Sequence, residues 1–419
     1  MEKFKTLLHE DARSMQFSLD HKDNREYSLK RRGGVLIRSF DGRWHSRAFE
    51  TIASDEVNRH MAWKPGGRPL PVHLAETAGK IMADHRLLID FLSRLGLQEW
   101  QLLFRSRHCL RTIQNTHRQE RRAATNLHSV SIRLKIKNQP LAVEIGEGSS
   151  DALKFNLDGL QRRVSEAVEH DRNCRQLAFN SQVPVVLQAG EGAILFHEIL
   201  GHSLEADYVF HGFSPFVRRD LGKTIAPEAL TVLCQDSRDP FFRDASVDDE
   251  GETCPSPLLV ENGVLRRFIA DYHYQKMLRL PERGHARLED FSCIPLPRMF
   301  AIYVQPGAYS AEEILASTPY GIYAREFGDG GLDFGAGRFF FHIRQSYLIE
   351  KGRLTAPLGS LTVSGRIREI LNDIGMVGND FKYDRGISYC QKNGQTLPVR
   401  VGQPTIKINK LFVNGGPSA

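Results

Sequence analysis

Cysteine is scarce in this sequence, and long apolar runs are missing. Six cysteines stand among 419 residues and none of them forms a CxxC pair, which argues against a disulfide scaffold and a four-cysteine zinc ribbon. The first residues lack the apolar core of a secretion signal, and no apolar run approaches the ~18 residues that a membrane helix needs. We therefore expect a cytoplasmic protein with reduced thiols and no membrane partner.

The rest of the composition is that of an ordinary globular chain. Hydrophobic residues make up 41% of the sequence and charged residues 25%, which excludes collagen-like and disordered classes. At about 100–200 residues per domain, the length predicts two or three domains. We expect an α+β fold, with an α/β N-terminal domain over residues 1–178 and a β-rich C-terminal domain over residues 179–419.

Local patterns predict elements in both domains. In the N-terminal domain they indicate a hairpin over residues 28–50 with its turn at Asp41-Gly42, a helix over 72–95, short strand runs over 100–145, and a helix at about 151–170 capped by Ser150 or Asp151. In the C-terminal domain they indicate a strand over 183–188, a helix over 193–205, and hairpins over 258–265 and 346–354.

Positive charge is concentrated in the first 150 residues, which hold 26 lysines and arginines against 17 acidic residues. The surplus is densest between Arg105 and Arg122. Such a stripe can attract nucleic acid or an acidic peptide, but no nucleic-acid motif accompanies it. A solvated face of a sheet or helix is the simpler interpretation, and we expect no nucleic-acid partner.

The pattern His197-Glu198-x-x-x-His202 carries the most chemical information. A catalytic zinc site needs three protein ligands and an open position for water, and Glu198 suits the role of general base beside that water. Five residues turn a regular α-helix by ~500°, which leaves the two imidazoles ~140° apart. Both can bind one ion only if a π-bulge widens the turn, and we expect it near Gly201, where the backbone deforms most readily.

The alternative for this pattern is one buried, hydrogen-bonded histidine and one surface histidine at a helix end. A metal site would also need a third ligand, and thiolate is a good zinc donor. Four cysteines lie downstream of the motif, although a free cysteine is more often an inert buried hydrophobe than a ligand. Chemistry alone does not choose among Cys234, Cys254, Cys293 and Cys390.

The segment Val183–Tyr208, which contains the motif, resembles the core of the TldD/PmbA family of zinc metallopeptidases, once named modulators of DNA gyrase. The resemblance is strong over about residues 180–413 and weak before residue 150. Further matches follow in order at Asp248–Gly251, Leu259–Leu265, Pro297–Met299, Tyr320–Tyr323, Tyr347–Glu350, Met376–Asp380 and Gly394–Thr405.

The resemblance implies a site and a substrate. TldD-like members carry H-E-x-x-x-H and take a third zinc ligand from a cysteine before the G-x-x-L-P-V segment, which is Cys390 here. An older family pattern would instead admit Cys234 or Cys254. The implied zinc ligands are therefore His197, His202 and Cys390, with Glu198 activating water. The implied substrate is an unfolded or leader-like peptide held in extended form along a sheet edge.

The resemblance also implies a dimer, either with a second copy or with a PmbA-like paralogue that lacks the motif. A second hypothesis is a non-enzymatic regulatory or binding protein attached to a nucleic-acid-linked complex, which the basic N-terminal region and the old family name favour. Zinc stoichiometry would separate the two hypotheses, since only the peptidase needs the ion.

Two features are harder to interpret. The glycine-rich stretch Gly328–Gly337 holds Phe334-Gly335 where the family more usually has small residues and serine, and its glycines fit either turns or close approach of an extended peptide. An acidic cluster lacks the ligand spacing of a calcium loop, and we expect it to be a solvated turn. Its members are Asp244, Asp248, Asp249, Glu250 and Glu252.

Overall fold

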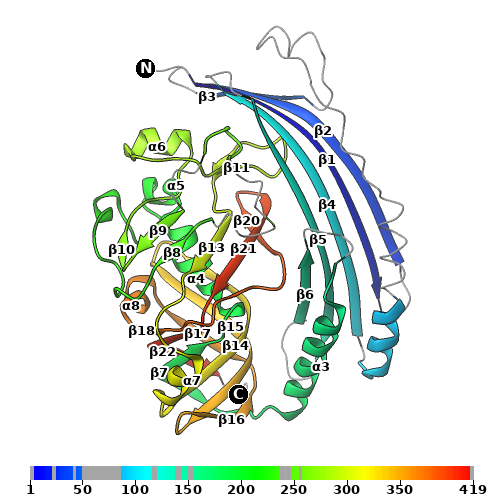
Figure 1. Cartoon of the computed structure of the whole chain (residues 1–419), viewed down its shortest axis with the longest axis vertical. Coiled ribbons are helices and arrows are strands. Elements are labelled where there is room, and N and C mark those ends of the chain that lie inside the picture. Colours follow the sequence, from blue (N-terminus) through cyan, green and yellow to red (C-terminus); the bar gives the residue numbers. More distant parts are fainter. Residues whose placement is uncertain are drawn as a thin grey trace.

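A long, curved N-terminal sheet arches beside a body built from two further sheets (Figure 1). This strand-rich arrangement with few helices confirms the predicted α+β class. The computed structural model describes residues 4–20, 25–40, 44–49, 86–97, 99–115, 120–136, 143–149, 154–235, 241, 247–253 and 257–415.

The N-terminal sheet has six antiparallel strands in the order β3-β2-β1-β4-β5-β6. The predicted hairpin over 28–50 is confirmed as the β2–β3 pair, although its turn at Asp41-Gly42 lies outside the described residues. The runs over 100–145 also form strands, but two of them are long rather than short. The strands are β1 (Phe4–Asp20), β2 (Arg25–Phe40), β3 (Trp44–Phe49), β4 (Glu99–Asn115), β5 (Glu120–Lys135) and β6 (Val143–Ser149).

Helix α3 (Leu157–Asn173) packs its apolar stripe on this sheet. Leu160 and Val164 are fully buried in one cluster with Val130 and Ile132, which alternate along β5. The predicted helix is confirmed but its predicted cap is wrong, because the side chain of Asn156 caps it by accepting from the Gly159 amide at 2.9 Å. Of the helix predicted over 72–95, residues 86–94 are helical and 72–85 lie outside the described residues.

Within the described residues, the body contains two seven-stranded sheets and a small ribbon formed by β11 (Ala286–Arg287) and β12 (Leu296–Pro297). The first sheet comprises β10 (Val264–Leu265), β9 (Leu258–Glu261), β8 (Val232–Leu233), β13 (Ala301–Val304), β21 (Gln395–Gln403) and β19 (Lys382–Tyr383), with β20 (Ser388–Lys392) paired to β21. The second comprises β14 (Tyr320–Asp333), β7 (Phe179–Leu187), β22 (Ile406–Gly415), β17 (Leu361–Arg366), β15 (Arg338–Glu350) and β16 (Arg353–Leu358), with β18 (Ile374–Val377) paired to β22.

Both predicted hairpins of the body are confirmed, as the pairs β9–β10 and β15–β16. Their turns place Asn262-Gly263 and Lys351-Gly352 at positive φ. This matches the demand of a two-residue hairpin turn for left-handed backbone, which glycine and asparagine adopt at least cost.

The helical segment that follows β7 lies inside the core of the body. Leu195, Phe196, Ile199 and Leu200 are all at most 1% exposed and belong to the same apolar cluster as Leu187 at the end of β7. This packing fixes the H-E-x-x-x-H segment from several sides. Within the described residues, no helix has the length and apolarity to cross a membrane.

Charged side chains join the N-terminal sheet to the body. Arg111 on β4 donates from Nη1 to both carboxylate oxygens of Asp249 at 2.9 Å, and from Nε to Glu10 at 2.8 Å. Arg38 on β2 donates to Glu250 at 2.8 Å. The ion pairs therefore connect strands of the arching sheet to the loop around residues 248–252.

The expectation of a solvated acidic turn is wrong. Asp248 and Glu250 are at most 1% exposed. Asp248 accepts from the amides of Glu250, Glu252 and Ala286 at 2.9 Å each, so its carboxylate holds the loop together from inside. Asp244 lies outside the described residues.

The solvated interpretation of the basic stripe is only partly right. Arg121 and Arg122 are exposed as expected, whereas Arg107 donates to the Glu289 carbonyl at 2.7 Å and Arg111 is engaged in the ion pairs above. Part of the positive charge of the first 150 residues is therefore used inside the molecule.

We predict that Arg111→Ala strongly destabilises the fold. It leaves the carboxylates of Glu10 and Asp249 buried without their cation, and breaking a buried pair in this way costs about 3–5 kcal/mol. Urea unfolding measures the loss. The matched control is Arg122→Ala, which removes an exposed pair with Glu120 and should change the free energy of unfolding by at most ~1 kcal/mol. Equal effects of the two substitutions would contradict the role assigned to Arg111.

Candidate metal centre

The motif segment changes its helical pitch at the first histidine. A single turn, α4 (Ile194–Phe196), leads into a π-helical turn over His197–Gly201. There the amide of His202 donates to the carbonyl of His197, a bond that spans five residues instead of four. The expected widened turn is confirmed, and the two imidazoles come together with ring centroids 4.9 Å apart.

Gly201 contributes to packing rather than to the backbone freedom that we expected of it. Its φ of −53° and ψ of −66° lie in the ordinary right-handed region, so the widened turn does not need the special freedom of glycine. A Cβ at this position would instead lie 2.3 Å from Met299 Sδ and 3.2 Å from Ile302. Glycine here leaves room for the side chains of Met299 and Ile302, which pack directly on the π-turn.

Strand β20 brings a thiol to the two histidines. Cys390 Sγ lies 3.0 Å from His202 Nε2, and one ligand atom from each of His197, His202 and Cys390 lies within 4.8 Å of the others. All three side chains are buried. The alternative of a surface histidine at position 202 is therefore wrong, because this side chain is 6% exposed.

The other cysteines stand apart from this cluster. Cys234 Sγ contacts His285 Nε2 at 3.0 Å inside the body. Cys293 is half-buried beside Asp290, and Cys254 lies outside the described residues. Among the described cysteines, Cys390 is thus the one that the fold places at the two histidines.

The far side of His202 is held by a buried ion network. His202 Nδ1 lies 2.8 Å from Glu205 Oε2, which leaves Nε2 facing Cys390. Lys392 Nζ donates to Glu205 and to Asp207 at 2.8 Å each, and all three charged side chains are at most 8% exposed. A carboxylate on the second nitrogen of a histidine is the common way in which proteins orient a metal-binding imidazole.

The donor set fits a zinc-type ion. Two imidazoles and one thiolate form a recognised ligand set that leaves a fourth position for water. His197 Nδ1 is buried and has no hydrogen-bond partner among the described residues, and a buried polar atom of this kind calls for one. The cluster is therefore a candidate metal site.

The same geometry shifts the ionisation of Cys390 and His202. Burial opposes ionisation of the thiol, but His202 and His197 lower the pKa of Cys390 to about 4. Burial alone would lower the pKa of His202, but Glu205 and Cys390 hold it well above its ordinary value. Without a metal, the two side chains therefore exist as a thiolate and an imidazolium at neutral pH.

Glu198 lies next to the cluster without belonging to it. Its side chain is half-buried, and its oxygens are not part of the group of ligand atoms within 4.8 Å. Among the described residues it forms neither a hydrogen bond nor an ion pair. Glu198 is therefore a carboxylate that is not committed to the structure.

The glycine-rich stretch forms the end of β14 and its turn into β15. A Cβ on Gly330 would lie 2.1 Å from the Phe341 ring, so this glycine lets the paired strand pack closely. The unusual Phe334 stacks on Tyr208 with ring centroids 4.3 Å apart. Tyr208 in turn lies below Lys392 Nζ, 4.2 Å from the ring centroid, so the turn reaches the ion network of the site.

Three contributors escaped the sequence analysis as individual residues. Glu205 and Lys392 orient His202, and Arg298 donates to the Cys390 carbonyl at 2.6 Å, which fixes β20. The sequence could have indicated Lys392, because alternate residues of a strand share a face and Cys390 stands two positions before Lys392. Glu205 follows His202 by three residues, within reach on a helical turn.

Comparisons with known proteins point to one and the same family for the body. Residues 180–415 match the family model described as the PmbA/TldA metallopeptidase C-terminal domain. The "Metalloprotease TldD homolog" of Buchnera aphidicola subsp. Schizaphis graminum is 38% identical over 232 residues, which cover 55% of this chain and 48% of that one. The "Zinc metalloprotease TldD homolog" of Saccharolobus solfataricus is 31% identical over 292 residues, covering 68% and 65%. The chain spans about half the length of its Buchnera and Haemophilus relatives.

The fold is shared more widely than the sequence. The crystal structure of TldE from Thermococcus kodakarensis superimposes with a TM-score of 0.74 at 17% identity, covering 99% of this chain and 97% of that one. The shared architecture therefore includes the described part of the first 150 residues, where sequence resemblance is weak.

We predict that the metal-free protein carries a thiolate at Cys390 at neutral pH. Because its pKa is lowered to about 4, the thiolate absorption band in the ultraviolet should persist at pH 7 and disappear as the pH falls through about 4. The stabilisation that this ionisation gives the fold is largest above the ordinary thiol pKa of 9.0 and declines progressively until the pH has fallen through about 4. The difference spectrum between the parent and Cys390→Ser, after chelator treatment, measures the band.

Cys109 provides the matched control. Burial raises the pKa of Cys109 to about 11, so Cys109→Ser should leave the thiolate band at pH 7 unchanged. A parent protein whose band is absent at pH 7, or whose band is unchanged in Cys390→Ser, would contradict the thiolate–imidazolium pair.

Proposed function

The chain belongs to the TldD/PmbA family of metallopeptidases, and from this premise we propose that it is a zinc-dependent peptidase whose metal ligands are His197, His202 and Cys390. The observation that carries the proposal is the buried cluster of two imidazoles and one thiol. Zn²⁺ bound there would supply a Lewis acid that polarises a peptide carbonyl and makes water a better nucleophile.

The chain's own residues would accept the proton and position the metal ligands. Glu198 is not committed to another partner and stands beside the first ligand, so it can accept the proton of the attacking water as general base. Glu205, held by Lys392, keeps the Nε2 of His202 turned toward the metal. Arg298 holds the β20 backbone at Cys390.

The proposed substrate is an unfolded or leader-like peptide bound in extended form. Among the described strands, β20 pairs only with β21, and we propose that a peptide adds a strand along its other edge. Strand addition supplies main-chain hydrogen bonds that do not depend on sequence. A peptide on this edge would run past Cys390.

The assembly and cellular context are also proposals. We propose a dimer, either with a second copy or with a PmbA-like paralogue, in the cytoplasm. Residues 1–178 would form the domain that controls substrate entry and dimerisation, and 179–419 the catalytic domain. Light scattering on the full chain, expressed alone and with such a paralogue, distinguishes the two assemblies.

The nucleic-acid-linked alternative loses support because Arg107 and Arg111 are engaged internally.

The ligand assignment predicts a selective loss of metal. Cys390→Ala should reduce bound zinc from one ion per chain to a small fraction, since two imidazoles alone bind Zn²⁺ much more weakly than the full set. Elemental analysis of the purified full chain measures the content. Cys234→Ala and Cys293→Ala are the matched controls and should retain the ion. Retention of zinc by Cys390→Ala, with loss in either control, would overturn the assignment.

The general-base role predicts a loss of cleavage without a loss of metal. Glu198→Gln keeps the size and hydrogen-bonding reach of the side chain but cannot take a proton, so hydrolysis of an unfolded peptide should fall at least ~100-fold. Zinc content should match the parent. The control is Glu228→Gln, an exposed substitution away from the site. Full activity of a zinc-loaded Glu198→Gln protein would remove Glu198 from the mechanism.

A further inference from the structure

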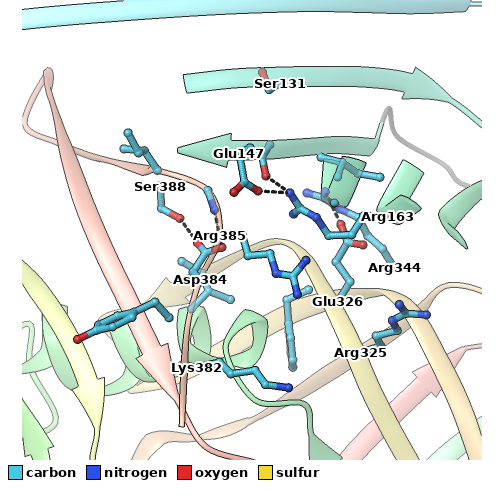
Figure 2. A pocket seen from close by; sticks show the side chains of 18 of the residues that line it. Ser131, Glu147, Arg163, Arg325, Glu326, Arg344, Lys382, Asp384, Arg385 and Ser388 are labelled. Atoms are coloured by element: carbon cyan, nitrogen blue, oxygen red, sulfur yellow. Dashed lines mark hydrogen bonds and ion pairs between the residues drawn. The ribbon is translucent and has the colours of Figure 1, made fainter. Parts of the chain in front are cut away.

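A cavity of about 490 Å³ lies between the N-terminal sheet and the body. One wall comes from β5, β6 and the first turns of α3, and the other from β14, β15 and the segment 382–388. Figure 2 shows Lys382 and Arg385 extending from that segment into the cavity, toward the side where Arg325 and Arg344 lie. The sequence analysis gave no indication of this cavity.

Cationic side chains outnumber carboxylates in its lining. The four carboxylates are Glu147, Glu166, Glu326 and Asp384, and the seven cationic side chains are Arg105, Arg162, Arg163, Arg325, Arg344, Lys382 and Arg385. The lining therefore carries a surplus of three positive charges when all of these groups are ionised.

Each of the four carboxylates already has a partner within the protein. Glu147 pairs with Arg163 at 2.7 Å, Glu166 pairs with Arg325, and Glu326 lies 3.6 Å from Arg344. Asp384 accepts from the amide of Gly386 and the hydroxyl of Ser388 within its own loop.

Four cations remain after these pairs. The guanidinium of Arg105 lies over the Tyr389 ring, 5.8 Å from its centroid. The side chains of the other three, Arg162, Lys382 and Arg385, are exposed and form neither a hydrogen bond nor an ion pair with any described residue. Lys382 and Arg385 extend into this concave site (Figure 2), and the lining as a whole keeps its positive surplus, which is the arrangement that attracts an anionic ligand. Guanidinium groups are particularly suited to carboxylates, which they bind through two parallel hydrogen bonds.

The cavity adjoins the candidate metal centre through two elements. Ser388 lines the cavity and shares one face of β20 with Cys390, and the strand rise places the two residues about 7 Å apart. Ile194 also lines the cavity and stands one helical turn before His197. A ligand in the cavity would therefore lie about two extended residues from the metal ligands.

We propose that this cavity binds a carboxylate of the peptide substrate, from an acidic side chain or from the C-terminus, a short distance from the cleaved bond. The inference rests on the proposed peptidase function for the identity of the ligand. The choice of a carboxylate follows from the proposed peptide substrate, which carries carboxylates. A single carboxylate is satisfied by Arg385 and one neighbouring cation.

The test measures binding directly, so that it does not depend on turnover. The protein is the full-length, zinc-loaded Glu198→Gln chain, and the ligands are fluorescein-labelled peptides that differ at one position, glutamate or glutamine. The position is scanned along the peptide, and each peptide is made as C-terminal acid and amide to separate the two sources of carboxylate. Fluorescence anisotropy at low salt gives Kd. We expect at least one carboxylate position to tighten binding about tenfold, as a charge-assisted pair does.

A pair of matched double variants locates the effect. Lys382→Gln with Arg385→Gln removes two of the free cations and should abolish the preference for the carboxylate peptide. Arg353→Gln with Lys410→Gln removes the same charge from exposed positions on β16 and β22 and should preserve it. Circular dichroism confirms that both proteins are folded.

The outcomes separate this inference from the proposed function. Equal Kd values for charged and neutral peptides, or the same preference in both double variants, would overturn the carboxylate site. Cleavage of both peptides by the parent at equal rates would support the peptidase while removing the carboxylate site. Charge-selective binding in a parent that hydrolyses neither peptide would support the site and contradict the peptidase.

Discussion

The buried ammonium of Lys392 is the interaction on which the geometry of the centre depends. Removing a charge from water is costly, and only complete pairing makes it tolerable. Here Glu205 and Asp207 provide two carboxylates and the Pro297 carbonyl a further acceptor. Because Glu205 also holds His202, the charge balance of the core and the direction of the His202 nitrogen that faces Cys390 are set by the same contact. The π-turn and β20 are tied together at this point.

Much of this site could be read from local sequence. The five-residue spacing of the histidines dictated a widened turn if both were to face one ion, and the turn is there. The choice of Cys390 needed the family resemblance, because four cysteines were chemically equivalent in sequence. The partnership of Lys392 with Glu205 joins residues 187 positions apart, and periodicity has no information about contacts of that range.

The errors share one physical cause. An acidic turn and a basic stripe each look like solvated surface, because charged residues are usually exposed. Arg111 and Asp249 are 138 positions apart, and only the tertiary fold turns two apparently exposed groups into one buried pair. The widened turn near Gly201 was anticipated, but the close packing of Met299 on that glycine was not, since this contact is not a local property. Hairpins, whose causes are local, were easier to anticipate.

The distance in sequence between His202 and Cys390 has a consequence for biosynthesis. The two side chains that meet at 3.0 Å are separated by 188 positions, and β20 is held in place by β21, which in turn pairs in parallel with β13. A nascent chain that has already made both histidines therefore has no thiol to complete the centre until β20 and β21 have emerged from the ribosome and docked. For the peptidase that we propose, cleavage would thereby wait until the body has closed, and unfinished neighbouring chains, themselves unfolded peptides, would be spared.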